Sequence, residues 1–449
     1  MSDTPEAEAS AAKPVLKLVF LTLFLDLIGF SILFPLFPEL LEHYLAAQGP
    51  DSAIGGLMER LEELVAGRAD PEFAVVVLFG GLLGSLYSVL QFLFAPFWGG
   101  LSDRIGRKKT LSFTIAGTAL SYVLWFFAGT FELLIAARVL GGIMAGNIAT
   151  ASAVVADVSP PAKRTKNMAV VGIAIGLGFV LGPAIGALAY AYLPVIEWWP
   201  GGADLGVNPF SGAALVALLL SLLNLMQVLG RFPETRKEGA PSAGEGHRRL
   251  PFRGMGVLAD KRITRANFVH LLYGVAFAAM EFTLVFLAAE RLGFGPTDNA
   301  KMFVFIGLTI AFVQGGFVRR RAESIGEQRL LLLGLFLLLP GFVTVGLVST
   351  SVAQLYLGLF LLASGSAMIM PTLASLVSLY APEESQGLAQ GSFRSMGSLA
   401  RAVGPLLGGL LYWGVASWAP YHLGALFLLL PLGLAAGLPQ PDRGEAPAG

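Results

Sequence analysis

Gly-Gly-Leu-Ser-Asp-Arg-Ile-Gly-Arg-Lys-Lys, residues 99–109, is the stretch of the chain that decides its fold. It is short, charged and interrupted by glycines, and an apolar run precedes it. A second apolar run follows from Thr110. Each run has about twenty residues, which is the length that crosses a bilayer as a helix. The stretch is therefore predicted to be a loop between two membrane helices, and the order of its residue types is more specific than its charge.

The composition indicates a membrane protein with many spans. The chain has 449 residues, of which 13% are charged, and its mean hydropathy is +0.71. A soluble domain carries about 25% charged residues, so this deficit excludes an ordinary soluble fold. Lys plus Arg and Asp plus Glu number 30 each, so no net charge attracts nucleic acid. With no cysteine and 4 histidines, we expect neither a metal nor a cofactor.

Signatures of common enzymes are missing from the sequence. No phosphate loop of the form Gly-x-x-x-x-Gly-Lys-Ser/Thr occurs, which argues against ATP-driven transport. Neither His-Glu-x-x-His nor Gly-x-Ser-x-Gly occurs, which argues against a hydrolase within the membrane. We therefore predict that the chain is not an enzyme.

Apolar runs long enough to span a membrane begin at twelve places. They start near Pro14, Ala74, Thr110, Phe131, Lys166 and Pro209, and then near Ile263, Asn299, Gln328, Ser351, Ser385 and Trp418. A polar segment, 231–262, separates six runs from six. We predict an all-α membrane protein of two six-helix bundles joined by this linker. The predicted division has tails at 1–13 and 440–449, bundles at 14–230 and 263–439, and an outer loop at 42–72.

Lysines and arginines in short loops set the orientation. Those of 99–109 share a side with Lys163 and Arg164, with the basic linker and with the arginines at 319–321. That side is predicted to be cytoplasmic and to carry both termini; in a bacterium the membrane is the inner, plasma membrane. The outer loop is acidic instead, and its residues 57–65 are predicted to form a short amphipathic helix.

The two halves repeat one another. Residues 178–187, in the fifth span, read Gly-Phe-Val-Leu-Gly-Pro-Ala-Ile-Gly-Ala. Residues 400–409, in the eleventh, read Ala-Arg-Ala-Val-Gly-Pro-Leu-Leu-Gly-Gly. Gly315-Gly316 and Gly326-Glu327, after the eighth span, are a decayed copy of the 99–109 loop. A duplication of this kind is the plan of transporters that bind their substrate between two halves.

Asp26 lies well inside the first apolar run, where a charged carboxylate is costly. It must face a polar cavity, pair with a cation or hold a proton. Arg138, in the fourth span, cannot lose its proton, so it needs an anionic partner, for which Asp26 is the first candidate. A carboxyl that balances burial against a nearby arginine can load and release a proton. The alternative is a structural carboxylate that is permanently paired.

The second half carries its own deep charges. Glu281 lies in the middle of the seventh span, and Arg394 and Arg401 lie in the eleventh. The two arginines are 7 residues apart, so they share a face, and that face must turn inward. They predict an anion site unless Glu281 and Asp26 neutralise them. Three arginines against two acids leave one positive charge, which favours an anionic or zwitterionic substrate.

Polar and aromatic side chains at similar depth are predicted to line a broad amphipathic cavity. The candidates are Phe30, Phe34, Tyr87, Gln91, Asn147, Asn224, Gln227, Tyr273, Phe277 and Gln354. We expect only a minority to touch ligand. Those assigned to substrate binding, with the two arginines of the eleventh span, are Phe30, Phe34, Asn147, Tyr273 and Gln354.

Gly-x-Leu-Ser-Asp-Arg-x-Gly-Arg-Lys within 99–109 resembles the loop between the second and third helices of the major facilitator superfamily. Asp26, Arg138 and the fifth-span Gly-Pro pattern resemble its drug:proton antiporter branch. Residues 78–85, 301–309 and 394–405 are similar to the tetracycline-transporter-like subgroup. The resemblance covers the chain except for the outer loop and the linker. It implies the major facilitator fold and a substrate that is an organic anion or an amphipathic drug.

The resemblance also implies a conformational gate. In the family the loop aspartate, here Asp103, lies against the start of the eleventh helix, where free N–H groups favour a carboxylate. The loop arginine, here Arg107, pairs with an acid at the end of the fourth helix, here Asp157. The residues assigned to the gate are Gly99, Asp103, Arg104, Gly106, Arg107, Asp157, Gly182 and Pro183.

Gly182 and Pro183 enter the gate for a mechanical reason. Glycines allow close packing and the proline removes a backbone donor, which predicts a bend and a tight seam; a purely structural kink is the alternative. The chain departs from the family at two places. Its second-half loop has Arg319-Arg-Arg-Ala-Glu323 instead of the Asp-Arg core, and its fifth-span pattern ends Gly186-Ala187 rather than Gly-Gly.

Our first hypothesis is a proton-coupled antiporter that exports its substrate by alternating access, with Asp26, Arg138 and Glu281 in proton coupling. The alternative is an importer or facilitator of a small organic acid or lipid-like solute on the same fold. A third hypothesis is a receptor or scaffold built on a transporter fold. The expected partners are a small anionic or amphipathic substrate, protons and the lipid bilayer, with no nucleic acid, and we expect a monomer.

Overall fold

The computed structural model describes residues 5–65, 71–199, 201–236, 260–294, 296–382 and 385–441, and almost all of these are helical. Most of the predicted linker and of the C-terminal tail lies outside the described residues. The first half contains α1 (Pro5–Ser31), η1 (Phe34–Leu36), α2 (Phe37–Gln48), α3 (Ala53–Val65), α4 (Pro71–Ile105), α5 (Arg107–Phe126), α6 (Phe131–Ile143), α7 (Asn147–Asp157), η2 (Pro161–Lys163), α8 (Arg164–Tyr192), α9 (Val195–Trp198), η3 (Gly202–Leu205) and α10 (Ser211–Arg231). The second half contains α12 (Lys261–Leu292), α13 (Pro296–Phe312), the π-helix η6 (Val313–Val318), α14 (Arg319–Ile325), α15 (Glu327–Gly346), α16 (Val352–Tyr380), α17 (Gln386–Gly414), α18 (Ala419–Phe427) and α19 (Leu429–Ala436).

Ten helical segments of the described chain are long and apolar enough to cross a membrane. Two more helices, α5 with 20 residues and α17 with 29, are as long but more polar. Together they make the twelve transmembrane helices that the sequence predicts. The polarity of α17 has a structural reason, because much of this helix packs along α4 and α12, although Leu406, Leu407 and Leu410 are exposed.

The first helix extends beyond its predicted membrane span. It begins at Pro5, because the segment before Pro14 is rich in Ala and Glu, which favour helix, while its part long and apolar enough to span begins at Ala12. The predicted tail 1–13 is therefore partly helical. The predicted amphipathic helix at 57–65 is confirmed as part of α3.

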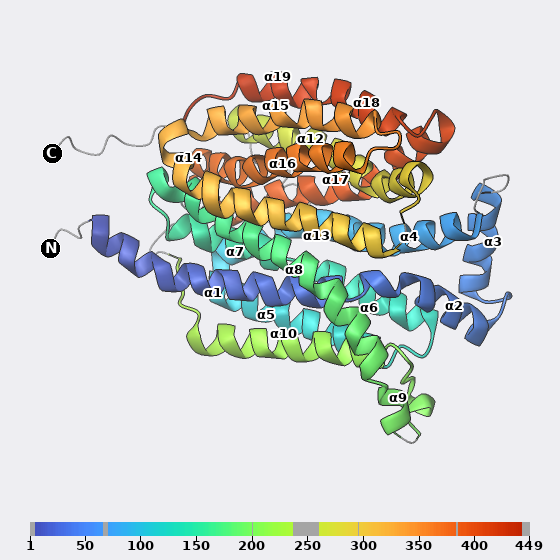
Figure 1. Cartoon of the computed structure of the whole chain (residues 1–449). Helices are drawn as coiled ribbons and strands as arrows, with labels where there is room; N and C mark the ends of the chain where they lie inside the picture. Colours follow the sequence, from blue (N-terminus) through green and yellow to red (C-terminus); the bar gives the residue numbers. More distant parts are fainter. Residues whose placement is uncertain are drawn as a thin grey trace.

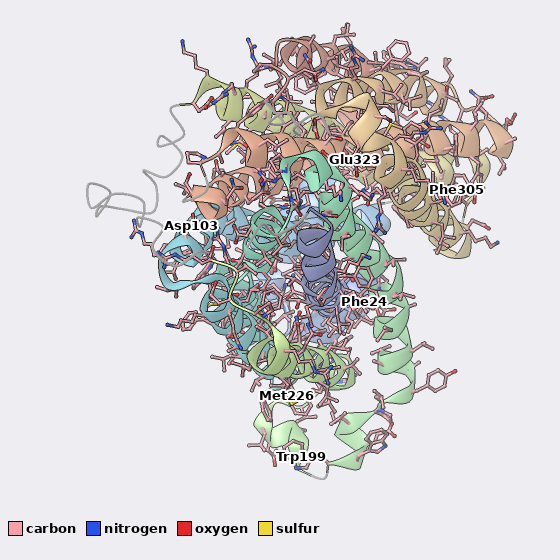
Figure 2. All side chains as sticks on the ribbon, turned by 90° about the vertical axis from the view of Figure 1, so that its left-hand side faces the viewer. Phe24, Asp103, Trp199, Met226, Phe305 and Glu323 are labelled. Carbon is pink, nitrogen blue, oxygen red and sulfur yellow. The ribbon has the colours of Figure 1, made fainter. Side chains whose placement is uncertain are left out.

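The two halves lie side by side along their length (Figure 1). The start of α1, the end of α19 and α14 lie at one end of the molecule, and α3 and α9 lie at the other (Figure 1). We call the first end the basic end, because Arg104, Lys109 and Arg320 are exposed there. The longest contact between the halves runs between α4 and α17, and α8 adds contacts to α13 and α16. Seen from the basic end, Asp103 and Glu323 lie near the boundary between the halves (Figure 2).

The backbone confirms the internal repeat of the loop. Gly106 has φ 104° and ψ 156° and caps the start of α5, while Gly326 has φ 89° and ψ 153° and caps the start of α15. A side chain other than glycine rarely adopts such positive φ values. The same turn therefore joins two helices in each half, although Arg107 follows it in one half and Glu327 in the other.

The Gly-Pro patterns form equivalent seams within the halves. In α8, a Cβ on Gly182 would lie 1.9 Å from Ser31 Oγ, and one on Gly186 would lie 2.1 Å from the Ile32 carbonyl of the neighbouring chain segment. In α17, a Cβ on Gly408 would lie 2.6 Å from the carbonyl oxygen of Ala279 in α12. Glycine is required at these positions because backbones touch there. The helix α8 continues through Pro183.

Gly186→Ala is expected to destabilise the protein, because the added carbon would force α8 away from Ile32. Overpacking of this kind costs about 1–3 kcal/mol. Gly176→Ala in the same helix meets nothing within 4 Å, so it is expected to be neutral or slightly stabilising. Thermal unfolding in detergent measures both variants. Equal melting temperatures would show that no tight seam exists at Gly186.

Candidate functional site

The basic end is held by a carboxylate that reaches from one half to the other. Asp103, near the end of α4, accepts hydrogen bonds from the backbone N–H groups of Gly387 and Leu388, each at 2.8 Å. These are free donors in the first turn of α17, where a negative charge is favoured. Gly99, one turn earlier, touches the backbone of Gly387, and a Cβ on it would lie 2.0 Å from that carbonyl oxygen. The contact expected for Asp103 is therefore present.

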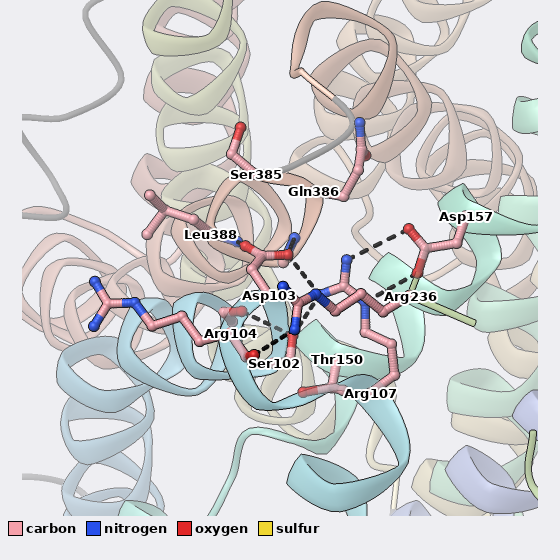
Figure 3. Close-up of polar contacts among 12 residues, drawn as sticks. Ser102, Asp103, Arg104, Arg107, Thr150, Asp157, Arg236, Ser385, Gln386 and Leu388 are labelled. Atoms are coloured by element: carbon pink, nitrogen blue, oxygen red, sulfur yellow. Dashed lines mark hydrogen bonds and ion pairs between the residues drawn. The ribbon is translucent and has the colours of Figure 1, made fainter. Parts of the chain in front are cut away.

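Arg107 lies buried between two aspartates (Figure 3). Its Nη1 donates to Asp103 Oδ1 at 2.6 Å and its Nε donates to Asp157 Oδ2 at 2.9 Å. The pairing expected from the sequence is thus confirmed, and the same guanidinium also holds Asp103 in place for α17. Arg104, in contrast, is exposed, and only its backbone carbonyl takes part, as acceptor of a hydrogen bond from Arg236.

The first residues after α10 complete this cluster, which sequence reasoning missed. The carboxylate of Glu234 accepts hydrogen bonds from the N–H groups of Arg107 at 2.9 Å and of Lys108 at 3.2 Å. It thereby caps α5, whose N-cap Gly106 has no side chain to do so. The hydroxyl of Thr235 donates to Asp157 at 3.1 Å. The only signal for Glu234 is an acid just beyond a helix, which says nothing about a partner more than a hundred residues away.

A second set of contacts joins the halves beside α8. Thr165 donates to Glu327 Oε1 at 3.1 Å, and Lys166 pairs with Glu323 at 3.3 Å. The Lys166–Glu323 pair is exposed to solvent and adds little stability. Arg164 donates to the carbonyls of Ala156, Ser159 and Ser378, so it bridges the ends of α7 and α16. Arginine is favoured there because helix C-termini carry free carbonyls and negative dipole ends.

The fourth span is broken in the middle of the molecule. Its helix α6 ends at Ile143 and α7 begins at Asn147. Trp98 of α4 fills the break: its Nε1 donates to the carbonyl of Ile143 at 2.5 Å, and its ring leaves no room for a Cβ on Gly146. Asn147, at the start of α7, donates to Asp26 Oδ1 at 2.8 Å and accepts from Thr114. Asp26 is therefore held by an amide and not by an arginine.

The expected ion pair between Asp26 and Arg138 was wrong. Arg138 is 7% exposed and packs between two rings, with its guanidinium carbon 5.0 Å from the centre of Tyr87 and 5.5 Å from that of Phe30. Within the described part of the chain, its Nε and Nη2 have no hydrogen-bond partner. Aromatic faces attract a guanidinium, which allows it to be buried without an acid. Both residues lie deep within their spans, but Asp26 contacts Asn147 and Arg138 contacts Tyr87 and Phe30.

The arginines of α17 reach across to the first half. Arg394 donates to Ser152 of α7 at 3.0 Å, and Arg401 donates to Gln91 of α4 at 2.6 Å. Arg401 and Glu281 are exposed although both lie far from the ends of their helices. They interact electrostatically, but none of the ion pairs within 4.0 Å in the described ranges involves either residue. The expected neutralisation of these arginines by direct pairing is therefore not observed.

Two predicted binding residues make hydrogen bonds within the second half. Tyr273 is 3% exposed and bonds through its hydroxyl to Ser366, within the second half. Gln354 lies in the first turn of α16 and donates to the carbonyl of Thr344 at 3.2 Å. Gln354 thereby satisfies one of the free carbonyls at the end of α15. Its place in the first turn of α16 puts it near the end of the span and not in the middle. Phe34 lies in η1 beyond the end of α1, and its side chain is outside the described part of the structure.

Comparisons with known proteins agree with this geometry. The family described as Major Facilitator Superfamily matches residues 19–405 and 317–448. Major facilitator superfamily domain-containing protein 10 of Bos taurus is 35% identical, over 96% of this chain and 94% of that protein. The class B tetracycline resistance protein of Escherichia coli is 25% identical, over 88% of each. The crystal structure of the human organic anion transporter MFSD10 (TETRAN) superposes with a TM-score of 0.81 at 33% identity, covering 94% of this chain and 98% of that one.

Asp103→Asn is expected to loosen the basic end. An amide offers one acceptor oxygen in place of two and loses its ionic pairing with Arg107, and a hydrogen bond to a charged group contributes about 1.5–3 kcal/mol. The chain has no cysteine, so a single Ser395→Cys variant provides one site for labelling with a maleimide. Ser395 is buried against α4, so its rate of labelling measures how often α4 and α17 separate. Labelling is expected to accelerate about tenfold or more.

The matched control is Asp260→Asn. Asp260 also caps a helix, α12, but it lies outside the contact between the halves. Labelling that stays slow in Asp103→Asn, or that rises equally in Asp260→Asn, would contradict a latch at Asp103.

Proposed function

This chain belongs to the major facilitator superfamily, and we propose that it is a proton-coupled antiporter that exports amphipathic drugs or organic anions by alternating access. It is an integral, multi-pass membrane transporter and not an enzyme. The observation that carries the proposal is the set of deep charges between the halves. Arg138, Arg394 and Arg401 have no acid in contact, and Asp26 and Glu281 have no cation in contact, within the described part of the chain.

The orientation follows from the loops. The basic end is the cytoplasmic end, because lysines and arginines of short loops stay in the cytoplasm. At that end the halves are joined by Asp103, Arg107 and the contacts of α8. The exposure of Glu281 and Arg401 in mid-helix fits an opening on the opposite side. The gate residues, with the Gly182 and Pro183 seam, hold the transporter in this outward-open state.

Asp26 is the proposed proton carrier. Its carboxylate is partly exposed and is held by one amide donor, Asn147, so a proton can reach it without breaking an ion pair. A carboxylate at this depth is costly unless it is neutralised, which favours proton uptake when no cation is near. Glu281 is the second candidate, because its charge interacts with Arg401. Arg138 takes part through its position over the ring of Tyr87, one turn before Gln91 on α4.

The substrate is proposed to be anionic because positive charge is in excess between the halves. Arg401 is exposed and Arg394 has an Nε without a partner in the described chain, so both offer donors to an anionic group. On the first half, the partly exposed ring of Phe30 packs against Tyr87 and Arg138 and is the aromatic surface that we assign to the substrate. Asn147 is buried and contributes through its hydrogen bond to Asp26. The relative of known structure is an organic anion transporter by its title, and other relatives are tetracycline resistance proteins.

Asp26→Asn is expected to abolish proton coupling while leaving exchange intact. With an acidic lumen, proteoliposomes of the unmodified protein should accumulate naphthalenesulfonate, a permanently charged aromatic anion. Accumulation is about tenfold for each coupled proton and unit of pH, since tenfold corresponds to about 1.4 kcal/mol. In Asp26→Asn the accumulation should disappear, and counterflow of labelled probe should persist. The exposed Asp51→Asn variant is the control.

Glu281→Gln separates the two carboxylates in the same assay. Coupled accumulation that survives Asp26→Asn but is lost in Glu281→Gln would transfer the proton role to Glu281. Transport by the unmodified protein that is indifferent to the pH gradient would identify an uncoupled facilitator instead.

Arg401→Ala is expected to weaken binding of naphthalenesulfonate about ten- to hundredfold, because a hydrogen bond to a charged group contributes about 1.5–3 kcal/mol. Isothermal titration in detergent measures the affinity directly. Arg320→Ala removes an exposed arginine at the basic end and should bind as the unmodified protein does. An equal loss in both variants would mean that the probe senses only overall charge.

A further inference from the structure

Gln91 connects the two halves at the level of the deep charges. It lies on α4, one turn beyond Tyr87 on the same face, and is 7% exposed. Its Oε1 accepts hydrogen bonds from Ser398 Oγ at 2.7 Å and from Arg401 Nη2 at 2.6 Å. A guanidinium can only donate, so the oxygen of the amide must face α17. The side chain of Gln91 therefore occupies the place at Arg401 that an anionic group of a ligand would take.

The other end of the same amide faces the broken span. Nε2 of Gln91 lies 3.5 Å from the carbonyl of Ala145, in the break between α6 and α7. Asn147, two residues later, donates to Asp26. One glutamine thus stands between the arginine of the second half and the segment that positions the carboxylate of the first.

Gln91 is also the last contact of a row that runs from the basic end to the middle of the molecule. Along α4 and α17 the row consists of Asp103 with Leu388, Gly99 with Gly387, Ala95 with Gly391, Phe92 with Ser395, and Gln91 with Ser398 and Arg401. Four of these five contacts have a backbone atom on at least one side. Gln91 is the member whose partner, Arg401, is exposed.

We propose that Gln91 is a surrogate for the substrate at Arg401, and that an arriving anionic group displaces it and so releases α4 from α17. This inference rests on the proposed function, since it requires that Arg401 binds the substrate. Displacement is favourable because a charged acceptor forms a stronger hydrogen bond to a guanidinium than a neutral amide does. The released amide then loses its contacts with Ser398 and with the carbonyl of Ala145 in the α6–α7 break. Binding of the anion thus changes both the contact between the halves and the segment that positions Asp26.

The test compares two substitutions of Gln91, one that removes the acceptor oxygen and one that makes it negatively charged. Gln91→Leu removes the competing oxygen, so naphthalenesulfonate should bind about five- to tenfold more tightly, and the Ser395→Cys reporter should react about tenfold faster without probe. Gln91→Glu places a carboxylate beside Arg401, so the probe should bind at least about tenfold more weakly and the reporter should stay protected. In the unmodified background the probe should accelerate labelling, and in Gln91→Leu it should add little.

Gln390→Leu is the matched control. Gln390 is a buried glutamine of α17 that bonds to the carbonyl of Ala374 inside the second half. Opposite shifts in the two Gln91 variants, absent in Gln390→Leu, support the proposal, because a general loss of stability moves both variants the same way. Unchanged affinity and labelling in Gln91→Leu, or shifts of the same sign in both variants, overturn it. If Arg401→Ala binds the probe as the unmodified protein does, the proposed anion site itself fails, and with it the role of Gln91.

Discussion

A buried arginine between two aspartates is the interaction on which the described state depends. Arg107 is 2% exposed, and its one positive charge is shared by two carboxylates, Asp103 and Asp157. The three groups together carry one negative charge, which the N-terminal turn of α17 favours. Removing one partner of such a cluster leaves an uncompensated buried charge, which is costly. Asp103 also accepts hydrogen bonds from the first turn of α17, so the charged cluster of the first half extends to the second half. The two halves are therefore joined by charged hydrogen bonds as well as by packing.

The middle of the molecule has the opposite character. There the arginines contact aromatic rings, hydroxyls and amides, and the carboxylates contact amides or solvent. Neutral partners hold a charge more weakly than an opposite charge does, so these groups remain available to a ligand or a proton. The helix α4 takes part in both kinds of contact. Asp103 and Gly99 lie at its end beside the charged cluster, and Gln91 and Tyr87 lie in its middle as neutral partners of arginines. The two kinds of contact therefore lie on one helix, with Pro96 between them.

The sequence predicted the fold and the contacts of Asp103 and Arg107, for a physical reason. Span length and loop charge are local properties of the sequence. Asp103 and Arg107 lie in a loop whose sequence motif is shared by the family. Contacts that depend on how helices rotate and slide were beyond reach. Arg138 and Asp26 were predicted to pair but do not. Gln354 was expected at mid-span, although it lies in the first turn of α16, whose start near Ser351 the sequence does predict. The cap by Glu234 joins segments far apart in the chain, and no local pattern encodes it.

The asymmetry between the halves follows from one turn used twice. Gly106 and Gly326 share a backbone conformation, yet the residue that follows is a buried cation in one half and a buried acid in the other. Arg107 gathers two aspartates, whereas Glu327 accepts from a hydroxyl, and the neighbouring pair of Glu323 with Lys166 is exposed. An exposed pair is screened by water and releases readily, whereas a buried pair holds until a competing change shifts the helices. The turn at Gly106 therefore carries a buried charged cluster, whereas beside the turn at Gly326 the ion pair between the halves is exposed.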